Sequence, residues 1–389
     1  MARKDEVFQI CKTLLLYSSV WLAKMPDWPK SSVKLYKVFS LLCQSLFVSC
    51  VPLFLVNLFK VIGHDMDTAV GVMKSLTFYG VVIAKIATIQ SSKMTKLIES
   101  AIKKEETFIR SNDFHIRNLF RKYCLYSNMC ALFVASFTSL TGIVLIIDSI
   151  YMASSYKIQY DSNVTDHFVY PHPVYMWFPF DKDSYYKCSL TYELIHIAQT
   201  TYYNGSAQAF IISALVLIKM QFKILQYRIK NLEPRRDNAI NLLKKYAREH
   251  QVLIRWIGEF NDDIKYIILL EYCVSSLTFA SILLDIIKGK QMAFNILFIL
   301  LTISQIFAVA WSANEIFNEG STGMSAALFE CPWYELDHSC KKCIQMMIMR
   351  CGKPLTITIG PFGFMTLDAA ISRVKLAFSL ISVLSTSTI

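Results

Sequence analysis

Two stretches near the end of the chain hold side chains whose types and spacing suit chemistry. Cys340-Lys-Lys-Cys343 has the spacing of one half of a tetrahedral zinc site. No second tight pair of ligands accompanies it, so we expect free thiols on a helix and no bound metal. The second stretch is the apolar segment 363–386 and its end, which charged and hydroxyl side chains interrupt: Ser372, Arg373, Lys375, Ser379, Ser382, Ser385, Thr386 and Ser387.

That last segment needs protein or water on one side, because charged groups are costly against lipid. A helix with one wet side can line a path for ions. The alternative is a helix packed inside a bundle, with its hydroxyls bonded to backbone carbonyls. A break rich in glycine and proline, 352–363, separates it from the polar helix before it.

Motifs of enzymes are absent from the sequence. It holds no phosphate-binding or dinucleotide-binding glycine loop, no HExxH and no nucleophile elbow. The histidines are scattered, and isolated histidines are more often packing residues than bases or ligands. His196 is the exception, because it lies in an apolar segment where it can hydrogen-bond a polar group of a ligand. We expect neither an enzyme nor a cofactor.

The elements that must position these residues are apolar and long. The 389 residues are 54% hydrophobic, and the apolar residues gather in runs, which favours an all-α membrane bundle over soluble domains. Seven segments are long and apolar enough to cross a bilayer: 36–63, 69–90, 124–149, 191–220, 265–287, 292–317 and 363–386.

The charge distribution orients this bundle. With the N-terminus in the cytosol, the inner segments hold 30 of the 40 basic residues and the outer loops hold seven. The positive-inside rule therefore predicts a cytoplasmic N-terminus and an extracellular C-terminus. The net charge of +11 is then explained by the lipid bilayer and not by nucleic acid. No cleavable signal peptide is evident, and we expect the apolar N-terminal stretch to lie on the inner membrane surface.

The loop between the third and fourth segments, 151–190, is predicted to lie outside. Asn163-Val-Thr165 is a glycosylation sequon within it. The loop is rich in aromatic residues and proline, which indicates either a lid over a cavity or rings resting at the level of the lipid headgroups.

Two inner segments have the pattern of amphipathic helices. Apolar residues follow gaps of three and four in both: Phe222, Leu225, Ile229 and Leu232, then Ile240, Leu243, Ala247, His250, Ile254, Ile257 and Ile264. We expect these helices to pack together, within one subunit or between subunits; the alternative is a basic pair lying on anionic lipid. The expected organisation is 1–220 with four spans and the pocket region, anchor segments 221–264 and 318–362, spans within 265–317, and a pore-lining end, 363–389.

Irregularly spaced residues of the C-terminal third resemble the signature of insect odorant receptors. They are Asn314-Glu315, Glu319, Ala326-Ala327, Trp333-Tyr334, Pro354-Leu355 with Thr358, Thr366-Leu367, Lys375 and Phe378-Ser379. Residues 221–232 and the region of His250 resemble the same family. The resemblance implies a ligand-tuned subunit of a non-selective cation channel in the plasma membrane of an olfactory neuron dendrite. It also implies a heterotetramer with an obligate co-receptor, held together by the cytoplasmic anchor.

The resemblance further implies a pocket for a small volatile ligand in the outer half of the bundle. By position, the ligand-binding candidates are Phe78, Tyr79, Ser139, Gly142, Ile146, Thr200, Tyr203, Phe294 and Phe298. Ser139, Gly142 and Ile146 share one helix face, and Gly142 leaves room for a ligand. The implied gate candidates are Val383, Thr386 and Ser387, and the polar Ser387 suggests an unequal contribution beside a more apolar co-receptor gate.

Three other classes of receptor fit the sequence less well. Gustatory receptors share the bundle but end in a motif closing with Gln-Phe, whereas this chain ends SLISVLSTSTI. The co-receptor itself has a longer loop between the fourth and fifth spans. A G-protein-coupled receptor needs its N-terminus outside, against the charge distribution.

Overall fold

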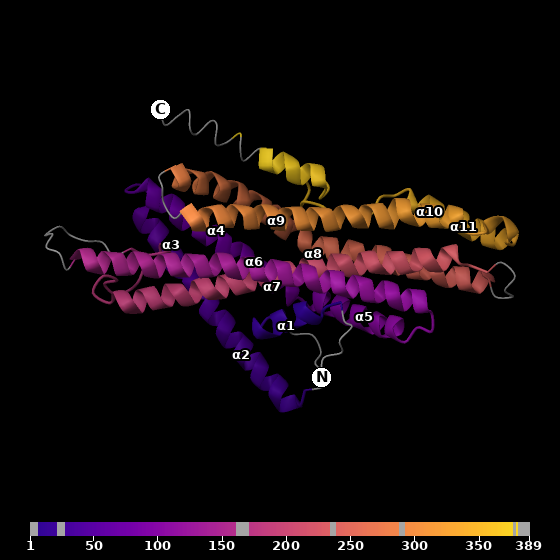
Figure 1. Ribbon diagram of the computed structural model, residues 1–389, viewed down its shortest axis with the longest axis horizontal. Coiled ribbons are helices and arrows are strands. Elements are labelled where there is room, and N and C mark those ends of the chain that lie inside the picture. The colour runs from indigo at the N-terminus through magenta and orange to yellow at the C-terminus, as the bar shows by residue number, and fades with distance from the viewer. Residues whose placement is uncertain are drawn as a thin grey trace.

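The apolar runs of the sequence form helices that extend far beyond the segments predicted to cross a bilayer. The computed structural model describes residues 7–21, 28–160, 171–233, 239–287, 292–375 and 379. Within them the long helices run along one axis (Figure 1), and an isolated bridge between Thr358 and Phe364 is the only β pairing. The predicted all-α fold is confirmed. The elements are α1 (Gln9–Tyr17), α2 (Lys30–Val48), α3 (Cys50–Val61), α4 (Met66–Ile89), α5 (Ser92–Ile109), α6 (Phe114–Tyr160), α7 (Tyr186–Lys230), α8 (Ala239–Ile287), α9 (Met292–Phe317), the π-helix η1 (Asn318–Gly323), α10 (Met324–Glu330), the 3-10 helix η2 (Trp333–Glu335) and α11 (His338–Cys351).

Five helical stretches of the described residues are long and apolar enough to cross a membrane. They are Lys30–Val61, Thr68–Ile89, Phe114–Ser154, Tyr186–Lys230 and Met292–Glu330. The predicted span 265–287 lies inside α8, and of the predicted span 363–386 residues 367–375 are helical. A count of seven spans and the side on which each terminus lies therefore stay predictions.

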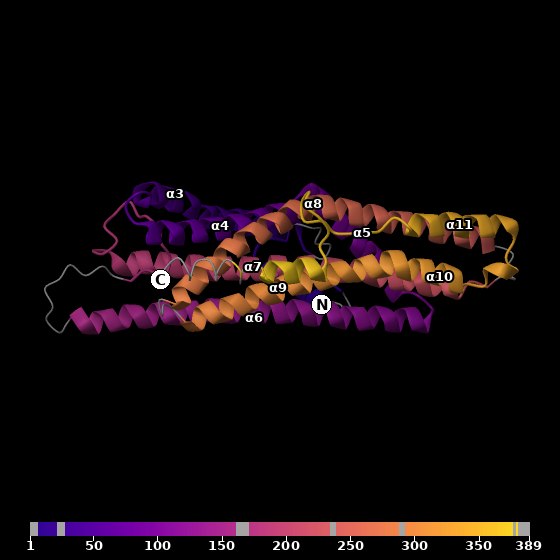
Figure 2. The ribbon, with the colours of Figure 1, turned by 90° about the horizontal axis from the view of Figure 1, so that it is seen from above.

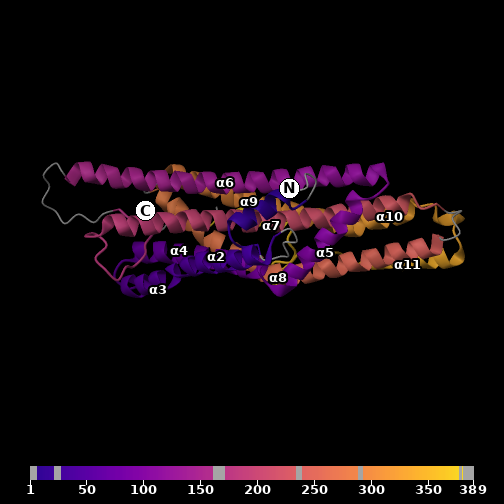
Figure 3. The same cartoon turned by 90° about the horizontal axis from the view of Figure 1, so that it is seen from below.

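Helix α7 is the centre of the bundle. Of its most apolar stretch 89% is buried, against 22–39% for the other four candidate spans. Figures 2 and 3 show α7 between α6 on one side and α8 on the other. Small residues permit this close packing, since a side chain at Gly205 would collide with Thr138 and one at Gly142 with Thr201. The helices on the periphery are left with apolar faces suited to lipid.

The first predicted span is two helices and not one. Helix α2 ends at Val48 and α3 begins at Cys50. Pro52 explains the break, because it has no backbone N–H to donate and its ring crowds the carbonyl of Val48.

The N-terminal helix α1 packs against α6 and α7, and its place at the inner membrane surface stays a prediction. Cys11 and Leu15 are fully buried, Phe8 stacks on Phe210 of α7 with ring centroids 6.0 Å apart, and the backbone N–H of Ile10 donates to Asn128 of α6 at 3.1 Å. The apolar residues of this helix are therefore used inside the bundle.

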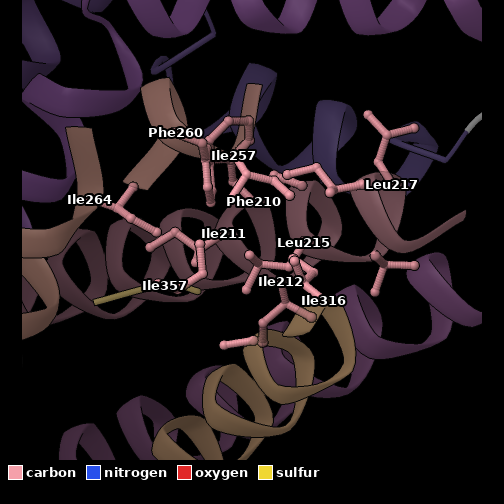
Figure 4. Close-up of a cluster of buried hydrophobic side chains, with 14 of the residues drawn as sticks. Phe210, Ile211, Ile212, Leu215, Leu217, Ile257, Phe260, Ile264, Ile316 and Ile357 are labelled. Atoms are coloured by element: carbon pink, nitrogen blue, oxygen red, sulfur yellow. The ribbon is translucent and has the colours of Figure 1, made fainter. Parts of the chain in front are cut away.

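The two amphipathic inner segments pack against each other within the chain. Phe222 of α7 and His250 of α8 have ring centroids 6.2 Å apart. Figure 4 shows the adjoining core, where Phe210 of α7 lies beside Ile257 and Phe260 of α8, and Leu215 of α7 lies beside Ile316 of α9. This accounts for the apolar stripes without a second subunit or a lipid surface.

The predicted break before the last helix is confirmed, with a small shift. Helix α11 ends at Cys351, and a turn follows in which Gly360 (φ +53°) and Gly363 (φ +151°) adopt left-handed backbone that favours glycine. The last helix begins at 367 and not at 363, because Thr366 caps it by accepting a hydrogen bond from the N–H of Ala369 at 3.2 Å.

Candidate functional site

A hollow of about 440 Å³, which includes its open side, lies between α4, α7, α8 and α9. We name it the polar hollow. Each of three helices contributes one face at helical spacing: Phe78, Val81 and Lys85 from α4; Glu271, Val274, Ser275 and Thr278 from α8; Phe298, Leu301, Thr302 and Gln305 from α9; and Asn204 is added by α7. The walls are mostly apolar and the polar groups gather at one end, which is the composition of a small-molecule site.

The polar end of the hollow is organised around Lys85, whose side chain is 1% exposed. Its ammonium donates to Asn204 at 3.0 Å, to Gln208 at 2.9 Å and to the Glu271 carboxylate at 2.8 Å. These three acceptors use the three donors of an ammonium group. A buried charge needs such a set of partners, because an unpaired one in a membrane bundle is strongly unfavourable.

The last helix is attached to the same stretch of α8. The Arg373 guanidinium donates to Ser275 at 2.6 Å and to Ser276 at 3.1 Å. It also lies 3.9 Å from the ring centroid of Tyr272, a cation–π distance. Glu271 and Ser275 therefore line the polar hollow on one side and lie beside the attachment of the last helix on the other.

Three of the predicted ligand-binding residues lie at or beside the polar hollow. Phe78 and Phe298 line it, with ring centroids 5.7 Å apart in an edge-to-face arrangement. Phe294 lies one turn from Phe298, at 5.5 Å between centroids. The structure brings these three together from two helices that are distant in sequence.

A second group of predicted residues lies in a closed aromatic cluster. Tyr79 faces away from Phe78 on α4, and its ring is 5.4 Å from Phe47 and 6.5 Å from His196. Tyr203 is 4.9 Å from Phe47. Thr200 donates to the carbonyl of His196 at 2.7 Å, and His196 is fully buried with neither ring nitrogen hydrogen-bonded to a described residue. These residues do not line the polar hollow.

The three predicted residues of α6 lie against α7. A side chain at Gly142 would come within 2.6 Å of Thr201, so the absent side chain allows α6 and α7 to approach. Ser139 and Ile146 are half-buried on the same face, and none of the three lines the polar hollow.

Four predicted residues fall outside the described part of the chain: the gate candidates Val383, Thr386 and Ser387, and the sequon residue Asn163. Within the described part, all eleven cysteines are free. No group of three or more metal-ligating side chains comes together in that part.

The described part of the outer loop covers the ends of α3 and α4. Val174, Met176 and Phe178 alternate inward and are buried. The Trp177 ring lies under the Lys60 ammonium at 4.6 Å, and Asn57 donates to the carbonyl of Tyr175 at 2.8 Å. Because His172 also contacts the buried Glu193 of α7 at 3.2 Å, the loop is fastened to both α3 and α7.

Several residues that resemble the odorant receptor signature hold neighbouring helices together. Glu315 and Glu319 form ion pairs with Lys219 and Lys223 of α7, the second at 2.7 Å. Gln226 donates to the carbonyl of Glu319 at 2.8 Å across the π-helix η1. Further along, Asn261 of α8 accepts from the N–H of Thr358 at 2.7 Å, which fixes the break before the last helix.

A second hollow, of about 330 Å³ including its open side, lies between α1, α5, α7 and α8. We name it the apolar hollow. Its lining is entirely apolar apart from the Trp256 indole, with Phe8, Met94, Phe210 and Phe260 among its residues. Phe210, Leu217 and Phe260 appear in Figure 4.

Sequence reasoning overlooked the polar residues of the polar hollow. Lys85 and Glu271 form an ion pair with each other, at 2.8 Å. Lys85 is buried although it is charged. The available signal was their charge within apolar segments, a mark of function in membrane proteins. Asn204 and Gln305 gave a weaker signal of the same kind, as polar side chains within apolar segments. Only the fold shows that these four residues lie around one hollow.

Comparisons with known proteins agree with this architecture. A family model described as 7tm Odorant receptor matches residues 65–378. Odorant receptor 10 of Aedes albopictus is 30% identical over 207 residues, 50% of this chain and 55% of that protein. The odorant receptor coreceptor of Ooceraea biroi is 24% identical over 130 residues, 32% of this chain and 27% of that protein. The chain thus spans about half the length of the first relative and about a quarter of the second.

A solved structure shares the fold along nearly the whole chain. The insect olfactory receptor OR5 of Machilis hrabei, in complex with eugenol, superposes with a TM-score of 0.77 at 14% identity. The match covers 98% of this chain and 97% of that one. It shows that this chain shares the fold of that receptor.

Proposed function

Because the chain belongs to the 7tm odorant receptor family, we propose that it is the odorant-binding subunit of a heteromeric, ligand-gated, non-selective cation channel. The ligand is a small volatile organic molecule that binds in the polar hollow. The last helix lines the pore, with the gate at Val383, Thr386 and Ser387. The chain is a receptor and not an enzyme.

The observation that supports gating from this hollow is the sharing of α8 between ligand site and last helix. Glu271 and Ser275 line the hollow, while Arg373 donates to Ser275 and stacks on Tyr272. A ligand that shifts this face of α8 therefore shifts the attachment of the last helix. Opening requires the ligand to bind the open arrangement more tightly than the closed one, whatever its absolute affinity.

The walls of the hollow suit a small ligand with an apolar body. Burial of such a body contributes roughly 25 cal/mol per Å² of apolar surface, and Phe78 and Phe298 offer rings against which it packs. OR5, which shares the fold, has been solved with eugenol, and this supports an aromatic molecule of similar size as a ligand class for the present chain. The outer loop 171–185 acts as a lid at the outer end.

The proposed topology has seven spans, a cytoplasmic N-terminus and an extracellular C-terminus. The basic residues of the inner segments support this orientation. Residues 221–264 and 318–362 then form the cytoplasmic anchor, and Asn163 is glycosylated on the outer side. Tags at the two ends test this orientation by antibody staining of intact and permeabilised cells. Staining of the N-terminal tag in intact cells would contradict it. Staining of the C-terminal tag only after permeabilisation would contradict it too.

The proposed partner is the odorant co-receptor in a heterotetramer, in the dendrite of an olfactory neuron. The presence of coreceptors among the relatives supports this partner. The test is to record odorant-evoked currents from cells that express the chain alone, the co-receptor alone, or both. We expect a new odorant response that needs both chains and persists when G proteins are blocked. A response abolished by that block would overturn the proposal.

A further inference from the structure

Gln305 differs from the other polar residues of the polar hollow. It lies on α9, one turn beyond Leu301 and Thr302, and is 5% exposed. Its amide nitrogen, Nε2, is buried and has no hydrogen-bond partner among the described residues. A buried amide donor without a partner is unfavourable, and a native site that keeps one has a use for it.

The polar neighbours of Gln305 are already engaged. The Lys85 ammonium has three acceptors. Ser275 donates to the carbonyl of Glu271 and accepts from Arg373. Thr278 and Thr302 donate to carbonyls of their own helices, at 2.8 Å each. Among the described lining residues, Gln305 alone holds a buried donor that is unpaired.

We propose that Gln305 selects the chemical class of the ligand, by donating from Nε2 to an acceptor oxygen of a ketone, aldehyde or ester. The apolar body of the ligand then lies along Phe78 and Phe298, which line the same hollow. This inference rests on the proposed function only in taking the polar hollow as the ligand site. A ligand with an acceptor oxygen gives the Gln305 amide a hydrogen-bond partner on binding, whereas a hydrocarbon of the same shape leaves the amide buried and unpaired.

The probes are three molecules with one carbon skeleton: acetophenone, 1-phenylethanol and ethylbenzene. The variant is Gln305→Met, which keeps the length of the side chain and removes the amide. The matched control is Gln221→Met, because Gln221 also holds a buried, unpaired Nε2 but lies outside the hollow. Binding is read as ligand-induced thermal stabilisation of the purified chain, and gating as current in cells with the co-receptor.

For the wild-type chain we expect acetophenone to bind at least tenfold more tightly than ethylbenzene. Gln305→Met should weaken acetophenone about tenfold, which is the ratio produced by one hydrogen bond of about 1.4 kcal/mol. The same variant should leave the affinity for ethylbenzene within threefold of the wild-type value. Gln221→Met should change the affinity for neither molecule. Equal weakening of both molecules by Gln305→Met, or a wild type that prefers 1-phenylethanol tenfold over acetophenone, would overturn the proposal; the second outcome would mean that the amide presents its oxygen.

The two readouts separate this inference from the proposed function. Binding that discriminates acetophenone through Gln305, with no current in any combination of chains, would sustain the ligand class and defeat the channel. Current evoked by odorants without a dependence on Gln305 would do the opposite. Failure of the wild type to bind acetophenone at its solubility limit would also count against Gln305 as the selecting residue.

Discussion

The two hollows of the bundle are similar in size and opposite in chemistry. The polar hollow, of about 440 Å³, has a buried ion pair at one end and an unpaired amide in its wall. The apolar hollow, of about 330 Å³, is lined by side chains such as Phe8, Met94 and Phe210. Burial of a ligand's apolar surface favours its binding in both hollows, but this effect is not directional and does not orient the ligand. Polar groups at fixed places give a site specificity, so the first hollow is suited to recognise a ligand and the second only to hold apolar matter.

The hollows also differ in what they are attached to. Glu271 and Ser275 connect the polar hollow to the last helix through Arg373. The lining of the apolar hollow comes from α1, α5, α7 and α8, and none of its residues bonds to the last helix in the described part of the chain. Binding in the first therefore has a route to the pore that binding in the second lacks.

The largest expected effect is the loss of the ion pair at the polar end of the polar hollow. Lys85→Met leaves the Glu271 carboxylate without its partner, a change that costs about 3–5 kcal/mol in buried pairs. We expect a large fall in melting temperature and in folded yield, both measured in detergent. Lys85→Met combined with Glu271→Gln should recover much of the loss. The control Lys223→Met breaks a pair with Glu319 whose lysine side chain is 34% exposed, and it should cost no more than about 1 kcal/mol. A Lys85→Met protein as stable as the wild type would show that this pair does not organise the hollow.

Acid should destabilise the packing of α7 against α8 through His250. Burial, and to a lesser extent the charge of Arg350, lowers the pKa of His250 to about 4 from its ordinary 6.5. The unfolded chain gains a proton below pH 6.5 while the folded chain stays neutral until about pH 4. Stability should therefore fall by about 3 kcal/mol as the pH drops through this window, and change no further below it. Melting curves of the wild type and His250→Leu between pH 7 and 4 test this. Parallel pH dependence in the two proteins would assign the effect to other groups.

The route to the pore is tested by Arg373→Gln. The change removes the guanidinium that stacks on Tyr272 and donates to two serines of α8. We expect the odorant concentration for half-maximal current to rise about tenfold. A tenfold change corresponds to about 1.4 kcal/mol, which lies within the typical range of coupling free energies, about 1–3 kcal/mol. The ligand dissociation constant, read from ligand-induced thermal stabilisation, should stay within threefold of the wild-type value. Lys375→Gln, on an exposed position of the same helix, is the control. An equal loss of binding and current would mean that Arg373 shapes the site and does not couple it to the pore.

The smallest effect is expected from filling the apolar hollow. Ala101→Leu adds apolar volume there and should leave the odorant concentration response within twofold. Leu301→Phe adds volume to the polar hollow and should weaken or change the odorant profile at least tenfold, because it occupies ligand space. Dose–response curves for a panel of odorants compare the two. A changed profile in Ala101→Leu would give both hollows a part in recognition.

The sequence by itself determined the helices and the class of protein. Period and run length of apolar residues predicted the all-α bundle, the break over 352–363 and the apolar stripes that pack Phe222 against His250. These are local properties, read from neighbours along the chain. Resemblance of the C-terminal residues predicted the family, and the structure gives them a physical role, for example Glu319 with Lys223.

Only the tertiary structure decided which residues share a site. Phe78 and Tyr79 are adjacent in sequence, yet one lines the polar hollow and the other the aromatic cluster around His196. Gly142 was expected to leave room for a ligand, and that space is taken by Thr201. Lys85, Glu271 and Gln305 come from three helices. Periodicity gives the face of each helix but not its rotation and depth against its neighbours, and these depend on side-chain packing over the whole bundle.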